Sequence, residues 1–171
     1  MLIYTGIGSR DTPIEIQELM TKIAQVLETK GYTLRSGGAN GADLAFEKGV
    51  TTLKEIYLPW KGFNHSTSPL YNVEQEALDM AAPHHGGWTY LKDAVKKLMG
   101  RNAYQVLGQD LNTPAKFVIC WTKDGVQTQA DRTNKTGGTG LAISLADSLG
   151  IPVFNLNNQG SYERILAMIS A

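Results

Sequence analysis

The stretch that decides the fold is KFVICWTKDGVQTQADRTNKTGGTGLAISLADSL, residues 116–149. An apolar run at 117–121 leads through a polar loop into Thr136-Gly137-Gly138-Thr139-Gly140, and a helical pattern of apolar residues follows at 141–149. This order is typical of a buried parallel strand that delivers a helix N-terminus to a ligand. The first amides of such a helix have no intrahelical partner, and glycines let a phosphate approach them. We therefore predict phosphate contact at 136–140, although a tight turn alone would also use these glycines.

Length and composition indicate one ordinary globular domain. The chain has 171 residues, of which 42% are hydrophobic and 19% are charged, and this length buries about two thirds of the unfolded surface. Lys and Arg together number 16, as do Asp and Glu. The balance provides no global attraction to nucleic acid or to an anionic membrane.

The cysteine content and the absence of targeting signals predict a cytoplasmic protein. Cys120 is the single cysteine and falls within the predicted strand at 117–121, which excludes an internal disulfide and favours a reducing compartment. Residues 1–6 show no basic segment followed by a long apolar core, and no apolar run is long enough to cross a bilayer. We expect no membrane partner.

Strand and helix patterns alternate along most of the chain. Strands are predicted at 2–7, 32–36, 54–58, 117–121 and 152–156, and helices at 13–30, 44–49, 73–82, 90–107, 141–149 and 162–169. Such alternation predicts an α/β fold with right-handed crossovers. We expect a single Rossmann-like domain with a doubly wound parallel sheet of about five strands, interrupted by an inserted segment at 60–88.

Three glycine-bearing turns follow predicted strands, and ligands of doubly wound sheets bind beyond the carboxyl ends of the strands. The first turn supplies a phosphate-binding hydroxyl and guanidinium, unless these are a helix cap and a surface arginine. The second turn would hold a ribose or base edge, although Asp43 could instead cap a helix or clamp the loop. The predicted ligand contacts in these two turns are Gly8, Ser9, Arg10, Gly37, Gly38, Asn40 and Asp43.

Several further side chains allow two interpretations. Arg101 and Asn102 either reach the crevice or lie on a solvated helix face. Lys123, Arg132 and Lys135 either close over an anion or are solvated. Trp60, Phe63 and Trp88 either pack the inserted segment or form a lid that stacks on a base. The spacing of His65, His84, His85 and Cys120 fits no standard zinc arrangement, so we predict no metal.

The glycine-bearing turns resemble those of the SLOG superfamily. Gly6-Ile7-Gly8-Ser9-Arg10 and Ser36-Gly37-Gly38-Ala39-Asn40-Gly41-Ala42-Asp43 are similar to the opening of DNA-processing protein A and its smaller relatives. Gly137-Gly138-Thr139-Gly140 resembles the start of the Gly-Gly-x-Gly-Thr-x-x-Glu signature of LOG phosphoribohydrolases. The superfamily also includes molybdenum cofactor carrier proteins, and its members commonly self-associate. The resemblance therefore implies a Rossmann-like fold and a homo-oligomer.

The chain departs from the LOG pattern where that family has Thr and its catalytic Glu, because Leu141 and Ser144 stand there. Arg101 matches the family's active-site arginine in approximate position. Without the carboxylate, LOG-type N-glycosidic cleavage lacks its acid–base group. The leading hypothesis is therefore a sensor, carrier or sequestering protein that binds a nucleotide or a nucleotide-derived phosphate ligand and needs no other cofactor.

Two other hypotheses remain. In an N-glycosidic hydrolase or transferase acting on nucleoside monophosphates, Asp43 or Asp11 would replace the absent Glu, with Arg101 as a further catalytic candidate. In a single-stranded DNA-binding module resembling DNA-processing protein A, binding would weaken steeply with salt. The zero net charge argues against the DNA-binding module.

Overall fold

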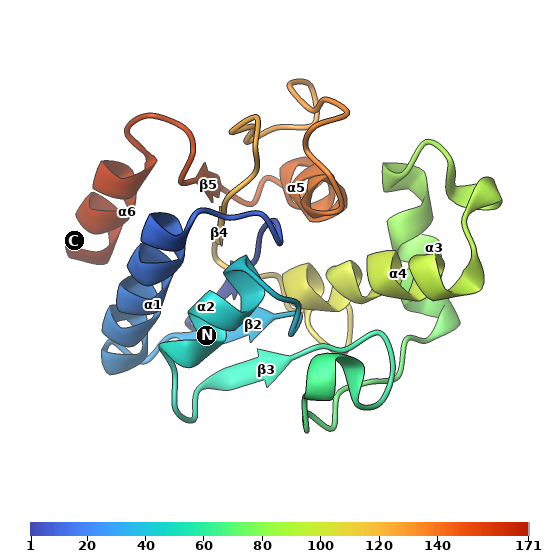
Figure 1. The fold of residues 1–171 in the computed structure, drawn as a ribbon, viewed down its shortest axis with the longest axis horizontal. Coiled ribbons are helices and arrows are strands. Elements are labelled where there is room, and N and C mark those ends of the chain that lie inside the picture. The colour runs from blue at the N-terminus through green and yellow to red at the C-terminus, as the bar shows by residue number, and fades with distance from the viewer. Residues whose placement is uncertain (171) are drawn as a thin grey trace.

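A five-stranded parallel sheet forms the centre of the computed structural model, which describes residues 1–170. The strand order is β3-β2-β1-β4-β5, so the predicted doubly wound α/β fold is confirmed (Figure 1). Thr5 in β1 pairs with Arg35 in β2 on one side and with Val118 in β4 on the other. The strands are β1 (Ile3–Gly6), β2 (Thr33–Ser36), β3 (Lys54–Ile56), β4 (Val118–Cys120) and β5 (Val153–Asn155).

Helices cover both faces of the sheet. α1 (Ile14–Thr29), α2 (Ala42–Lys48) and α6 (Ser161–Ser170) contribute to the core on one face. α4 (Asp93–Leu107) and α5 (Thr139–Ser148) pack on the other face. The chain therefore leaves β1 and β4 toward opposite faces, and the strand order reverses between these two neighbours. In open α/β sheets, the crevice at such a point is the usual ligand position.

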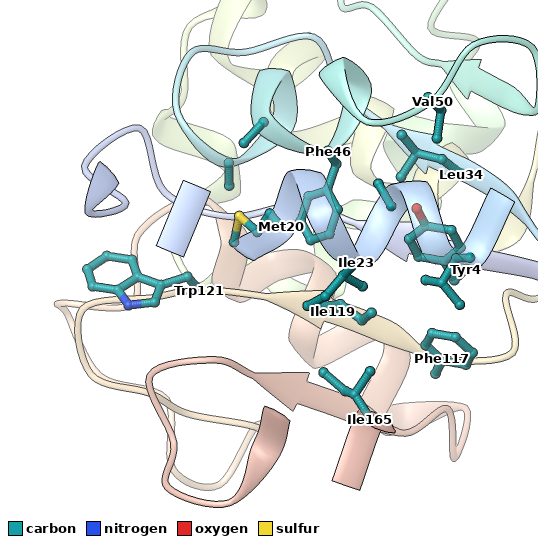
Figure 2. Close-up of a cluster of buried hydrophobic side chains, with 14 of the residues drawn as sticks. Tyr4, Met20, Ile23, Leu34, Phe46, Val50, Phe117, Ile119, Trp121 and Ile165 are labelled. Atoms are coloured by element: carbon teal, nitrogen blue, oxygen red, sulfur yellow. The ribbon is translucent and has the colours of Figure 1, made fainter. Parts of the chain in front are cut away.

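The core on the α1 face consists of aromatic and aliphatic side chains from the sheet and its helices (Figure 2). Tyr4 in β1 stacks on Phe117 with ring centroids 5.8 Å apart, and it meets Phe46 of α2 edge-on at 6.4 Å. Offset and edge-to-face pairs of this kind add stability beyond simple burial. Trp121 lies at the edge of the cluster, beyond the end of β4 (Figure 2). This packing fixes the strand ends from which the site is built.

The inserted segment at 60–88 contains α3 (Gln75–Ala81) and short helical turns at Phe63–His65 and Ala82–His84, and a third turn, Trp88–Tyr90, begins at its last residue. α3 packs along α4. α4 begins at Asp93, later than the predicted start at 90, because residues Trp88–Tyr90 form a separate turn that ends in extended backbone at Leu91. Within residues 1–170, we find no helix that combines the length and apolar character needed for a bilayer crossing.

Candidate functional site

The three predicted turns converge on one cavity of about 400 Å³ at the carboxyl ends of β1 and β4. The first turn contributes Gly8, Ser9 and Arg10, while the second contributes Asp43 through the start of α2. The backbone explains the convergence at the switch point, because the amide of Ser9 still donates to the carbonyl of Trp121 at 3.1 Å. Beyond this hydrogen bond, the segment that follows β1 and the segment that follows β4 separate. The third turn and α4 complete the cavity with Thr136, Gly137, Gly138, Thr139, Arg101 and Asn102.

The N-terminus of α5 presents unused amides at this cavity. Among the described residues, nothing accepts a hydrogen bond from the amides of Gly137, Gly138 and Thr139, whereas Gly140 and Leu141 donate to carbonyls within the turn. Gly137 has a φ of 72°, a conformation that glycine adopts without steric cost. Gly137 and Gly138 are exposed. The turn therefore leaves three backbone donors without an acceptor among the described residues, and phosphate contact at this turn stays a prediction.

The first and second turns are packed directly against each other. The carbonyl of Ser9 accepts hydrogen bonds from the amide of Ala42 at 3.3 Å and from the hydroxyl of Thr12 at 2.6 Å. A Cβ on Gly41 would lie 2.6 Å from that same carbonyl oxygen, so this contact requires glycine. The Ser9 hydroxyl accepts from the amide of Asp11 at 3.0 Å. This packing holds Ser9 and Arg10 at the cavity.

Three buried polar side chains form the floor of the cavity: Asp43 is 4% exposed, Arg101 7% and Gln105 1%. They converge on Gly37, where an added Cβ would lie 2.8 Å from Asp43 Oδ2, 3.0 Å from Arg101 Cζ and 2.1 Å from Gln105 Nε2. An Arg101 guanidinium N–H donates to the Gly37 carbonyl, and the Ala39 amide donates to Asp43 Oδ2 at 3.2 Å. Gly37 is therefore required by the floor.

Burial changes the proton affinities of the two charged floor residues. Burial raises the pKa of Asp43 to about 6, against the opposing effect of the nearby Arg101 charge and of the Ala39 amide. Burial likewise lowers the pKa of Arg101 below its ordinary value, with Asp43 partly offsetting the shift. Asp43 therefore titrates near pH 6. Strongly shifted pKa values are more common at functional sites than elsewhere.

The cavity carries more positive than negative charge although the whole chain is neutral. Its basic lining residues are Arg10, Arg101, Lys123 and Lys135, while Asp11 and Asp43 are acidic. Lys123 and Lys135 line the cavity and are also exposed, so closure over an anion by these lysines stays a prediction. Zero net charge is therefore a poor guide to the local potential.

Part of the predicted second turn contacts the inserted segment. Asn64 of the inserted segment donates to the Gly38 carbonyl and to Asn40 Oδ1, both at 2.9 Å. Gly37, Gly38 and Asn40 do not line the cavity. Asn64 covers Gly38 and Asn40, whereas Gly37 lies behind the floor residues; ligand contact at these three residues stays a prediction.

Two predicted residues of the third turn have internal partners. The hydroxyls of Thr136 and Thr133 both donate to Asp124 Oδ2, and the Thr122 hydroxyl donates to Oδ1 at 2.9 Å. The Thr136 hydroxyl is thus an anchor of the loop and is not free for a phosphate. Gly140 lies outside the cavity, since a Cβ there would come within 2.6 Å of Arg132 Nε. Thr136 still lines the cavity while Gly140 does not, and phosphate contact at these two residues stays a prediction.

The aromatic residues of the inserted segment pack against the domain. The ring of Phe63 lies 5.2 Å from Arg101 Cζ, and Trp60 meets Phe63 edge-on at 5.5 Å. Neither residue lines the cavity, and Trp88 does not line it either. Phe63 instead supports the guanidinium of Arg101 from outside. The structure therefore shows a packing role for Phe63.

Sequence analysis missed Gln105, Leu98 and Met99, which line the cavity together with Arg101 and Asn102. The signal was present, because residues 98, 101, 102 and 105 fall on one face of a helix. Ser144, at the LOG Glu position, does not line this cavity; it faces a second one.

The fold and the site together define a Rossmann-like α/β protein with a polar crevice at the switch point of its sheet. The structure is similar to that of DNA processing protein A from Helicobacter pylori, which was described for its single-stranded DNA binding mode. The TM-score is 0.57 at 17% identity, and the match covers 99% of this chain and 74% of that chain. The predicted likeness to the fold of DNA-processing protein A is confirmed. The chain matches no family model and no curated protein.

Proposed function

We propose that the cavity binds the phosphate of a nucleotide ligand and that the protein acts as a sensor, carrier or sequestering protein. The observation that carries the proposal is the set of unused amides at Gly137, Gly138 and Thr139, residues that line a cavity with four basic side chains. Backbone donors at a helix N-terminus and a nearby arginine are the groups that bind phosphate most readily. The cavity volume of about 400 Å³ falls within the range of small-molecule sites.

The position of Ser144 favours binding over LOG-type cleavage. This side chain stands where the LOG enzymes have their catalytic Glu, yet it donates to or accepts from His84 on the other side of α5. The cavity therefore has no carboxylate from α5, and its acidic residues come from the first and second turns. A binding role requires only the donors that the cavity already presents.

Titration calorimetry with nucleoside 5′-monophosphates tests this proposal, with the matching nucleosides as ligands that lack phosphate. We expect the monophosphates to bind, the nucleosides to bind far more weakly, and inorganic phosphate to compete. Arg10→Gln should weaken binding by about tenfold, since it removes one charged hydrogen bond. Lys22→Gln on the exposed side of α1 is the matched control. Equal binding of nucleosides and monophosphates would contradict the proposal.

A second candidate is the binding of single-stranded DNA through the same cavity. It is favoured by the structural likeness to a DNA processing protein whose single-stranded DNA binding has been described, and by the exposed Arg10, Lys123 and Lys135 at the cavity. Fluorescence anisotropy with a labelled oligodeoxynucleotide tests it. Competition by a mononucleotide would assign both ligands to one site.

A further inference from the structure

A second cavity of about 420 Å³ lies between α5, the loop that precedes it, and the turn after α3. It shares no lining residue with the first cavity. His84, Arg132 and Ser144 are brought together there from three separate segments of the chain. These polar side chains belong neither to the proposed nucleotide site nor to the hydrophobic core. Their arrangement therefore needs an explanation of its own.

The hydroxyl of Ser144 is bonded in an unusual way for a serine within a helix. Such a hydroxyl ordinarily bonds a backbone carbonyl one turn earlier, and Ser148 does so with the Leu145 carbonyl at 2.7 Å. Ser144 Oγ instead lies 2.7 Å from His84 Nδ1. The two serines line the same cavity, but only Ser144 is paired with a group that can take its proton.

The surroundings of His84 keep its ring available as a base. Burial lowers the pKa of His84 from its ordinary value of 6.5, and the positive charge of Arg132 lowers it further. The other charged residue that lines this cavity is Asp147 on α5, and His85 is the neighbouring titratable residue in the chain. A neutral imidazole with its proton on Nε2 leaves Nδ1 as the acceptor for the Ser144 hydroxyl.

Arg132 is positioned by the backbone of His84 and by the space that Gly140 leaves beside α5. Its Nη1 donates to the His84 carbonyl at 2.6 Å, and its Nε lies 2.6 Å from the place where a Gly140 Cβ would be. Gly140 and Ser144 are four residues apart and therefore share one face of α5. The glycine thus lets the guanidinium lie against the helix one turn before Ser144, where it supplies positive charge to the cavity.

We propose that Ser144, His84 and Arg132 form a nucleophilic site that takes the acyl group of a small carboxylic ester. Ser144 Oγ attacks the carbonyl carbon, its proton passes to His84 Nδ1, and the carbonyl oxygen becomes an oxyanion stabilised by Arg132. When the ester C–O bond breaks, the leaving alkoxide takes the proton from His84, and the acyl group stays on Ser144. Water then attacks the acyl carbon and gives one proton to His84. That proton returns to Ser144 Oγ as the carboxylic acid leaves.

The test is covalent labelling with diisopropyl fluorophosphate, followed by intact mass measurement and peptide mapping, together with the hydrolysis of p-nitrophenyl acetate. We expect one adduct on Ser144, none in Ser144→Ala, and wild-type labelling in Ser148→Ala, which removes the other hydroxyl of the cavity. His84→Gln keeps a polar partner but no base, so its labelling rate should fall by on the order of a hundredfold.

The pH dependence separates a nucleophile from a structural contact and stays informative if Ser144→Ala fails to fold. As pH increases, the labelling rate of the wild type should rise with a midpoint below the ordinary histidine pKa of 6.5. The labelling rate of His84→Gln should show no such midpoint. An adduct elsewhere, no adduct on the folded wild type, or equal rates in wild type and His84→Gln would overturn the proposal.

Discussion

Gly37 lies where the three floor residues converge, and its substitution gives the first prediction. In Gly37→Ala, the new Cβ meets Gln105 Nε2 at 2.1 Å and Asp43 Oδ2 at 2.8 Å. We expect the free energy of unfolding to fall by about 1–3 kcal/mol, the usual cost of overpacking, and nucleotide affinity to fall as Arg101 is displaced. Urea denaturation measures the first effect. Gly86→Ala, where a Cβ meets nothing within 4 Å, is the control and should change stability little.

The second prediction concerns the proton on Asp43. Burial raises its folded-state pKa to about 6, above the unfolded value of about 3.9. The folded state therefore holds the proton more tightly, so the free energy of unfolding falls as pH rises from about 4 to about 6. We expect wild type to lose roughly 2–3 kcal/mol relative to Asp43→Asn across this window. Parallel urea titrations at several pH values measure this, and identical pH slopes in the two proteins would contradict it.

At the residue scale, the position of the cavity is easier to predict from the sequence than the full set of residues that line it. Ser9, Arg10 and the turn at 137–139 are predictable because each follows a buried strand directly and must emerge at the same sheet edge. Glycine is ambiguous, since Gly38 packs closely against Leu58 and Gly140 packs closely against Arg132, a reason for glycine that needs no ligand. Only the three-dimensional neighbours of a glycine distinguish this reason from ligand approach.

The loop between β4 and α5 acts as one preformed element, held by Asp124, and this gives the third prediction. Burial raises the pKa of Asp124, but the threonine hydroxyls that donate to it outweigh burial, and the net pKa lies below its ordinary value. Asp124→Ala should cost about 1–3 kcal/mol of stability and weaken phosphate binding, because the α5 amides lose their fixed position. Thermal unfolding and calorimetric titration measure the two effects.

Asp131→Ala in the same loop is the matched control, because Asp131 is exposed and accepts from the Thr128 hydroxyl alone among side chains, at 3.1 Å. Phosphate affinity that falls equally in both variants would show that the Asp124 network does not position the site.

At the element scale, the type of the five strands and of the covering helices, and their succession along the chain, follow from the sequence. Short apolar runs between amphipathic segments leave little choice but a parallel sheet. The inserted segment at 60–88 is different, because its short turns show no hydrophobic periodicity. Its aromatic residues could also either pack against the domain or form a lid. Contacts such as that between Phe63 and Arg101 join residues far apart in the chain, and no local pattern encodes them.

The whole molecule carries no net charge, yet three of its exposed cations, Arg10, Lys123 and Lys135, line one cavity, and the salt dependence of DNA binding is the fourth prediction. If Arg10, Lys123 and Lys135 each neutralise one phosphate, the logarithm of the binding constant should fall with the logarithm of salt concentration with a slope of about −2 for single strands. Lys123→Gln combined with Lys135→Gln should reduce the magnitude of the slope by about 1. Lys22→Gln combined with Lys30→Gln, which removes two exposed charges along α1, should leave it unchanged. Anisotropy titrations at several salt concentrations measure the slope. An equal reduction in both double variants would place the DNA on a diffuse surface and not at the cavity.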